Sequence, residues 1–403
     1  MSKTIIIIGA GLAGLSAALQ AAENGCNVKL VSSFPSERAQ SVMAEGGINA
    51  ALNTKDENDS PEEHFTDTIK AACGLADPNA VWGMTQAAPE LVHWLLKLGV
   101  KFNMSGYDDV DLRNFGGQKK KRTAFAQSDT GKQIMTAMID AVRRKEASGM
   151  VERFSHHSFL TLRLCDNICC GCVIRDEYSQ ETVELPGDAV IVATGGMHGL
   201  FGNTTGSLSN TGEVTAELFR LGVPLANGEM IQYHPTTVKC GGKRMLISEA
   251  ARGEGGRLFA MKDGKQWYFM EEKYPELGNL MPRDITAREI WKVSHESEVF
   301  LDMTEISEEI ISNKLSGLAD DCMTYLHKDI RKEPVSVLPG IHYFMGGILV
   351  DEQHRTPIQN LYAAGECCAQ YHGANRLGGN SLLGALYGGR VAAKSACEQA
   401  DVV

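Results

Sequence analysis

Three apolar runs, each followed at once by a glycine turn, stand far apart in the chain. Residues 3–8 are dominated by isoleucine, residues 188–193 are similarly apolar, and residues 360–364 form a shorter run. Uninterrupted apolar runs of this length are typical of strands buried on both faces of a parallel sheet. The pattern therefore predicts an α/β domain whose sheet is assembled from distant segments.

Helical patterns fill much of the first 150 residues. A small-residue helix is expected from 12 to 24, and a second follows Ser60 as its N-cap and ends near residue 74. Residues 79–99 predict two helices interrupted at Pro89, and residues 132–147 predict another. The segment 154–184 has β-rich pieces separated by polar turns, which predict a small antiparallel sheet inserted before residue 188.

Residues 229–343 lie between the second and third strand-turn segments and have no glycine-rich nucleotide turn of their own. They predict an inserted domain, which leaves 1–228 and 344–403 as one discontinuous domain. At 403 residues with 43% hydrophobic content, the chain can bury more than one core. A substrate site is expected in the cleft between the two domains.

The first glycine turn reads Gly9-Ala-Gly11-Leu-Ala-Gly14. Gly9 permits the tight turn, Gly11 lets the backbone approach a pyrophosphate, and Gly14 lets the helix pack close to the strand. The helix N-terminus offers unpaired amides to phosphate oxygens, so a dinucleotide site is predicted. An NAD site usually carries an acid about 20 residues later, where this chain has Ser32 and Ser33. That difference and the two further strand-turn segments favour FAD.

Composition narrows the class of protein further. A net charge of −11 argues against nucleic acid as a partner. No apolar stretch reaches the roughly 18 residues of a membrane span, and the first apolar run is a strand rather than a signal peptide. Eleven cysteines fit free thiols in a reducing cytosol. We expect a cytoplasmic protein, either free or peripheral to a membrane complex, with no metal site.

Many ordered motifs together make the chain resemble the flavoproteins of the fumarate reductase and succinate dehydrogenase family, which also includes L-aspartate oxidase. Besides the first glycine turn they are Glu45-Gly-Gly47, Phe115-Gly-Gly117, Asp129-Thr-Gly131, Ala193-Thr-Gly-Gly196, Gln232-Tyr-His-Pro-Thr236, Ser248-Glu249, Arg252-Gly-Glu-Gly-Gly256, Arg283-Asp284, His342-Tyr343, Gly346-Gly347, Gly365-Glu366 and Asn375-Arg376. The resemblance covers essentially the whole sequence.

The resemblance implies a Rossmann-type, glutathione-reductase-like FAD-binding domain with an inserted α+β capping domain. The family's helical C-terminal domain is expected to be absent, because the sequence stops about where it begins. The residues implied to bind FAD are Gly9, Gly11, Gly14, Ser32, Ser33, Gln40, Ser41, Gly46, Gly47, Ala193, Thr194, Gly195, Gly365, Glu366, Ser381 and Leu382. Members with covalent flavin carry a histidine where this chain has Gln40, so non-covalent FAD is expected, with a flavin potential that favours reduction.

The resemblance also implies a chemistry for the site. Reducing a C=C bond between two carboxylates needs a hydride, which flavin N5 would supply, and groups that hold and polarise the carboxylates. The residues implied to contact a C4-dicarboxylate are Phe115, His234, Ser248, Glu249, His342 and Arg376. General pKa rules alone favour a histidine as the acid. The resemblance instead assigns proton delivery to Arg283, with Glu249 and Arg252 as the relay that returns the proton.

Other conspicuous residues have simpler interpretations. Most remaining histidines are expected to be structural or exposed, namely His64, His93, His156, His157, His198, His295, His327 and His354. For His372, two roles are about equally expected: support of the surrounding loop and contact with the substrate. Cys165, Cys169, Cys170 and Cys172 are expected to pack in a core rather than bind metal. The basic run at 119–122 is expected to be a solvated loop.

Three functions remain open at this level. The first is a reductase of fumarate or a similar enoate, fed by an iron–sulfur or other electron-donor protein. The second is L-aspartate oxidase, which carries an acid where this chain has Phe115. The third is a flavin-binding electron carrier without its own turnover, which the presence of His234, Arg283, His342 and Arg376 disfavours.

Overall fold

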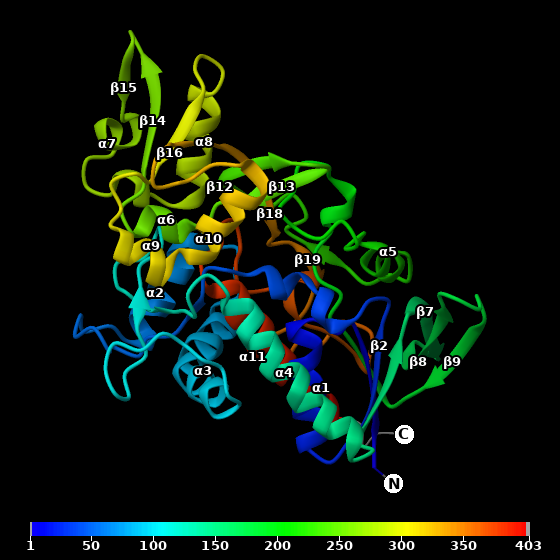
Figure 1. The fold of residues 1–403 in the computed structure, drawn as a ribbon. Helices are drawn as coiled ribbons and strands as arrows, with labels where there is room; N and C mark the ends of the chain where they lie inside the picture. The colour runs from blue at the N-terminus through cyan, green and yellow to red at the C-terminus, as the bar shows by residue number, and fades with distance from the viewer. Residues whose placement is uncertain (1, 400–403) are drawn as a thin grey trace.

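A five-stranded parallel sheet forms the centre of the computed structural model, which describes residues 2–399 (Figure 1). Its strands, in spatial order, are β20 (Leu361–Ala363), β10 (Ala189–Val192), β1 (Thr4–Ile8), β2 (Asn27–Ser32) and β6 (Val151–Ser155). Neighbouring strands pair in parallel, which confirms that distant apolar segments build one sheet. The edge strand β6 was missed, because its side chains are mostly polar and only Val151 is buried.

Both faces of β1 are covered, as its isoleucine run predicted. Ile5 and Ile7 belong to a core made with the helices, whereas Ile6 and Ile8 belong to a second core on the opposite face. The helices of the first core are α1 (Leu12–Glu23), α3 (Pro78–Lys97), α4 (Thr130–Ala147) and α11 (Asn380–Gln399), which lie together in Figure 1. None of the helices within residues 2–399 is long and apolar enough to cross a membrane.

Helix α3 runs unbroken through Pro89, so the prediction of two helices was wrong. An interior proline removes one hydrogen bond and costs about 3 kcal/mol. Here the apolar face is buried on both sides of the proline, through Val81 and Met84 before it and Leu91 and Leu95 after it. At about 1.5–3 kcal/mol for each large side chain, this burial outweighs the cost of the proline.

Residues 231–344 build a separate group of sheets and helices, above the central sheet in Figure 1. One sheet has the order β13 (Lys243–Leu246), β12 (Ile231–Cys240), β18 (Leu338–Phe344); the other has β15 (Lys265–Trp267), β14 (Arg257–Lys262), β16 (Val299–Asp302), β17 (Val335–Ser336). Their helices are α6 (Glu249–Gly253), α7 (Phe269–Lys273), α8 (Arg283–Val293), α9 (Glu308–Lys314) and α10 (Ser316–Asp321). The group has its own apolar core, although the domain limits given above stay a prediction.

The predicted small antiparallel sheet is present as β7 (His157–Cys165), β8 (Ile168–Asp176) and β9 (Thr182–Pro186). Cys169 and Cys172 are buried in it, as expected. Cys165 is exposed and Cys170 is half-buried, and the two form a disulfide across the turn between β7 and β8, which corrects the expectations of core packing and of free thiols there. The remaining elements are α2 (Pro61–Ala72), α5 (Glu213–Arg220), β3 (Ile48–Asn49), β4 (Leu112–Arg113), β5 (Thr123–Ala124), β11 (Leu225–Ala226), β19 (Gly347–Leu349) and β21 (Cys368–Ala369).

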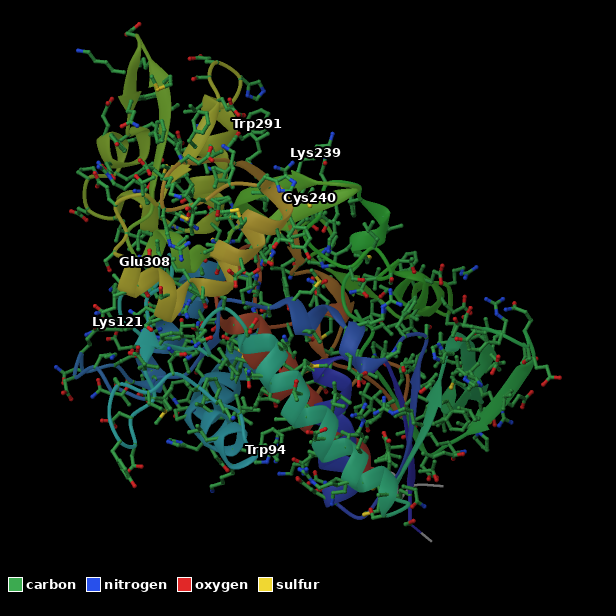
Figure 2. All side chains as sticks on the ribbon, viewed as in Figure 1. Trp94, Lys121, Lys239, Cys240, Trp291 and Glu308 are labelled. Atoms are coloured by element: carbon green, nitrogen blue, oxygen red, sulfur yellow. A yellow bond between two sulfur atoms is a disulfide. The ribbon has the colours of Figure 1, made fainter. Side chains whose placement is uncertain are left out.

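The basic run at 119–122 is solvated only in part. Lys121 is half exposed at the edge of the molecule (Figure 2), but Arg122 is fully buried. Arg122 donates from Nε and Nη2 to Asp59 at 3.1 and 2.8 Å, and its Nη1 lies 3.0 Å from Asp67. A buried cation needs such partners, because losing one leaves an uncompensated charge that costs about 3–5 kcal/mol. Arg122 is therefore part of the packed interior rather than of a solvated loop.

Candidate active site

A cavity of about 1340 Å³ lies where the glycine turns of the central sheet meet residues 234–342 of the inserted segment. All the residues predicted to bind FAD line it except Gly14. The residues predicted to contact substrate also line it, namely Phe115, His234, Ser248, Glu249, His342 and Arg376, together with Arg283. The structure thus brings residues from distant parts of the sequence into one site large enough for a dinucleotide and a small acid.

The first glycine turn has the shape of a pyrophosphate cradle. A Cβ on Gly14 would lie 1.8 Å from the carbonyl oxygen of Gly9, so only glycine allows the helix to pack this close. A Cβ on Gly11 would have no atom within 3.5 Å and would stand in the cavity space instead. Helix α1 begins there without a side-chain N-cap; the N–H of Leu12 donates to Ser41, and the next N–H groups of the first turn are available to phosphate oxygens. The residues present therefore fit FAD.

Gln40 lines the cavity. Its Oε1 accepts a hydrogen bond of 2.6 Å from the backbone N–H of Ser207, and both residues line the cavity. The neighbouring Ser41 Oγ accepts from the N–H of Leu12 at 3.3 Å. The loop that carries Gln40 is thereby tied to the start of α1 and to the segment after the second glycine turn.

A buried ion-pair cluster forms the inner end of the cavity. Arg283, at the start of α8, donates from Nε to Glu249 Oε2 at 2.8 Å, and its Nη1 donates to Gln232 Oε1 at 3.1 Å. Arg252 Nη2 lies 3.4 Å from the other oxygen of Glu249. Burial alone would raise the pKa of Glu249, but the two arginines outweigh it and hold that pKa below its usual range. Glu249 is therefore an anion between two cations.

Arg252 does not line the cavity, unlike the other predicted catalytic residues. It lies behind Glu249 on the short helix α6, one turn further along the chain. The three side chains Arg283, Glu249 and Arg252 thus form a continuous series of ion pairs that leads from the cavity into the protein.

Arg376 supplies a further buried cation beside this cluster. Its guanidinium carbon lies 4.2 Å from the ring centre of Tyr343, and its Nε is buried without a hydrogen-bond partner. Burial, followed by the nearby charge of Arg283, lowers the pKa of Arg376 to about 9. Such a group is stabilised by an incoming anion, and a guanidinium can hold a carboxylate through two hydrogen bonds.

His234 and His342 pack edge-on against each other, with ring centres 5.0 Å apart. Burial lowers the pKa of each far below its usual value, and the positive charge of Arg283 adds to the effect. Both imidazoles are therefore neutral at pH 7. Thr205, which sequence reasoning missed, fixes the second ring, because its Oγ1 lies 2.8 Å from His342 Nδ1.

Phe115 lines the cavity and packs against two glycines. A Cβ on Gly46 would lie 2.7 Å from its ring, and a Cβ on Gly378 would lie 2.6 Å from it. The ring is almost fully buried, and the next residue, Gly116, donates its N–H to Glu249 at 2.9 Å. The apolar ring therefore occupies a position at which an acid would stand close to Glu249.

Several lining residues carried no recognisable signal in the sequence. His156 and His157, expected to be structural or exposed, line the cavity near Ser33, and Arg244 lines it near the inserted sheet. His372 packs edge-on against Tyr343, with ring centres 5.4 Å apart, and does not line the cavity, which favours loop support. These positions depend on tertiary packing that no local motif encodes.

Glu45 lines the cavity with its Oε2 buried and without a hydrogen-bond partner. Burial, with smaller contributions from Asp321 and Asp129, raises the pKa of Glu45 to about 8. The unfolded chain would release this proton near pH 4.5, so the folded protein loses stability as the pH rises from about 4.5 to 8.

We expect Glu45→Gln to remove this loss of stability with rising pH, because the amide side chain, like the protonated acid, carries no charge. The variant should raise the free energy of unfolding by more than about 1 kcal/mol at pH 8.5, since one pKa unit corresponds to about 1.4 kcal/mol, and by much less at pH 5. Urea unfolding at the two pH values measures the difference. An equal effect at both pH values would contradict the raised pKa.

Comparison with known proteins places this site in a family. The family model described as "FAD binding domain" matches residues 4–382. The chain is 45% identical to the succinate dehydrogenase flavoprotein subunit of Bacillus subtilis over 98% of its length and 69% of the relative. It is 34% identical to the L-aspartate oxidase of Streptomyces coelicolor over 98% of its length and 68% of the relative. The structure of E. coli quinol fumarate reductase superimposes with a TM-score of 0.92 at 31% identity, over 99% of this chain and 70% of that one.

Proposed function

Because the chain belongs to the FAD-binding family of succinate dehydrogenase and fumarate reductase flavoproteins, we propose that it reduces fumarate, or a similar enoate, to succinate. As a member of that family it is an FAD-dependent oxidoreductase that acts on CH–CH bonds. The observation that carries the proposal is the buried Arg376, whose Nε has no partner, beside Arg283 and two neutral histidines in the FAD cavity. This surplus of hydrogen-bond donors and positive charge suits a substrate with two carboxylates.

When bound, FAD supplies the hydride for the reduction. Arg376 would hold one carboxylate with its guanidinium, and His234, Ser248 and His342 would donate hydrogen bonds to the carboxylates. A polarised carboxylate accepts the charge that develops during reduction, and a preorganised buried site stabilises that charge without reorganisation. These roles for the four side chains are our proposal.

Arg283 would deliver the proton to the other alkene carbon. His234 and His342 are poor candidates, because burial lowers their pKa so far that neither carries a spare proton at neutral pH. Arg283 reaches into the cavity and is bonded to the anion Glu249, which Arg252 supports from behind. The carboxylate of Glu249 can accept a proton from Arg252 and pass it to Arg283, which prepares the site for the next turnover.

We propose that FAD is held non-covalently and that the reductive direction is favoured. The support is Gln40, which has no nucleophilic imidazole and whose side chain is engaged with Ser207. Acid precipitation of the folded holoprotein should therefore release FAD into the supernatant. Flavin fluorescence that stays with the denatured polypeptide would show that the link is covalent.

The experiment that tests the function is anaerobic. The purified protein is photoreduced without oxygen, and fumarate or crotonate is then added while the flavin absorbance is followed. Fumarate should restore the oxidised spectrum and crotonate should not, because crotonate has one carboxylate, whereas the proposed site binds two. If succinate bleaches the oxidised flavin while fumarate leaves the reduced flavin unchanged, the protein works as a dehydrogenase instead.

We also propose an electron-donating protein partner, of the iron–sulfur or another redox class. The named relatives support this, because the protein from Bacillus subtilis is described as a flavoprotein subunit. A location in the cytoplasm, free or peripheral to a membrane complex, stays a prediction.

A further inference from the structure

His198 lies directly behind the cavity wall, in contact with Glu366. The proposed chemistry gives Glu366 no detailed role. His198 follows the second glycine turn and is fully buried, but it does not line the cavity. Its Nε2 lies 3.1 Å from Oε1 of Glu366, which does line the cavity. Its ring also packs edge-on against Phe344, with centres 5.0 Å apart. The histidine therefore acts on the cavity through Glu366.

The neighbours of His198 determine where its protons lie. Nδ1 is 2.7 Å from Thr204 Oγ1, and that hydroxyl is also 3.2 Å from the carbonyl oxygen of Ile341. If the hydroxyl donates to Nδ1, the neutral ring carries its proton on Nε2. An ionised carboxylate only accepts, so this tautomer, with Nε2–H donating to Glu366, is the one that satisfies both neighbours.

Glu366 is held at one oxygen only. The backbone N–H of Phe344 donates to the same Oε1 at 3.0 Å, so both hydrogen bonds that hold the carboxylate end on that atom. This arrangement leaves Oε2 as the acceptor available to a ligand in the cavity. A carboxylate oxygen that is fixed in position and accepts only is suited to a hydroxyl group of the cofactor.

Two glycines leave room for this pair. A Cβ on Gly206 would lie 2.2 Å from Cγ of the His198 ring, and a Cβ on Gly196 would lie 2.7 Å from Glu366 Oε1. The imidazole and the carboxylate thus occupy space that other residues at 206 and 196 would fill. The pair is built into the wall by close backbone approach on both sides.

We propose that His198 is a positioning residue for FAD, which fixes and orients Glu366 so that its free oxygen accepts a hydrogen bond from the cofactor. The inference rests on FAD in this cavity, as in the proposed function, and is independent of which acid is the substrate. Its test therefore measures FAD affinity rather than turnover.

The test begins with three substitutions at one position. His198→Gln places an amide N–H near the position of Nε2 and keeps the bond to Glu366, whereas His198→Asn reaches only the position of Nδ1 and keeps the bond to Thr204. His198→Leu removes both bonds. The dissociation constant for FAD is measured from the fluorescence of cofactor released on dilution of the holoprotein. We expect a rise of about tenfold or more for Asn and Leu, the scale of one hydrogen bond to a charged group, and less than about threefold for Gln.

A matched control is His354→Leu. His354 is also fully buried, but it bonds to Tyr371 and the carbonyl oxygen of Ala363 and does not line the cavity. This variant should keep FAD affinity near the wild-type value. A loss as large as that of His198→Leu would mean that any buried histidine matters equally, which overturns the proposal.

A double-mutant cycle decides whether His198 acts through Glu366. Glu366→Gln should weaken FAD binding, and adding His198→Leu to it should have little further effect, because the carboxylate to be positioned is gone. Additive losses, an unchanged affinity in Glu366→Gln, or retention of affinity by Asn but not Gln would each overturn the proposal. If His198→Leu does not fold, the comparison of Gln with Asn still decides. Failure here is distinct from failure of the substrate assignment, which fumarate reoxidation tests separately.

Discussion

Replacing Arg283 by alanine is expected to lower fumarate turnover by about 10²-fold or more while FAD stays bound, which is the scale of lost general acid catalysis. Arg283 reaches the cavity from the first turn of α8, with Nε on Glu249 and Nη1 on Gln232. Truncation removes the proposed proton donor and leaves the glycine turns that hold the cofactor untouched. Substrate affinity should change only modestly, because Arg376 and the two histidines remain.

Two control variants separate chemistry from binding and from folding. Arg376→Ala should raise the KM for fumarate strongly, because it removes the buried cation that lacks a partner for its Nε. Arg288 lies on the same helix, is largely exposed and pairs only weakly with Asp284 at 3.9 Å. The turnover of Arg288→Ala should therefore match that of the wild type. The measurements are kcat and KM with a chemically reduced dye as electron donor. Near-normal turnover of Arg283→Ala would show that the proton comes from another group.

The cofactor half of the site could be predicted from sequence because its residues form local units. A buried strand, a glycine turn and a helix N-terminus follow one another in the chain. The residues next to Gly9, Gly11 and Gly14 in the sequence therefore already indicate the structure that these glycines form. The outcome agrees: Gly14 packs against Gly9 and Gly11 stands open to the cavity. The same holds for the short strands at 189–192 and 361–363, each of which precedes a turn in the cavity wall.

Features that depend on long-range packing could not be predicted in this way. Pro89 usually interrupts a helix, but burial on both sides of it keeps α3 continuous. Arg122 looked like part of a solvated basic run because its partners, Asp59 and Asp67, lie more than 50 residues earlier. His198 belongs to the wall of the site only through Glu366, 168 positions away. In each case the structure depends on contacts between segments that are far apart in the sequence, and a local sequence pattern contains no information about such contacts.

Phe115 provides the test between a reductase and an L-aspartate oxidase, an activity named among the relatives. The ring packs against Gly46 and Gly378 and offers only apolar surface to the cavity. An L-aspartate ammonium beside it would be buried without an anionic partner, which costs several kcal/mol. Glu249, a carboxylate close by, is already paired with Arg283 and Arg252.

L-aspartate should therefore be a poor reductant of the bound flavin, whereas fumarate should be a good oxidant of the reduced form. Phe115→Glu is expected to weaken the use of fumarate, because a second carboxylate next to Glu249 repels a dianion, and to improve the reaction with L-aspartate. Phe115→Leu keeps the surface apolar and serves as the control, so it should retain the preference for fumarate. Anaerobic stopped-flow absorbance with each acid measures both rates. Rapid bleaching of the wild-type flavin by L-aspartate, with formation of iminoaspartate, would favour the oxidase, because it would mean that the cavity accepts an ammonium despite the apolar ring.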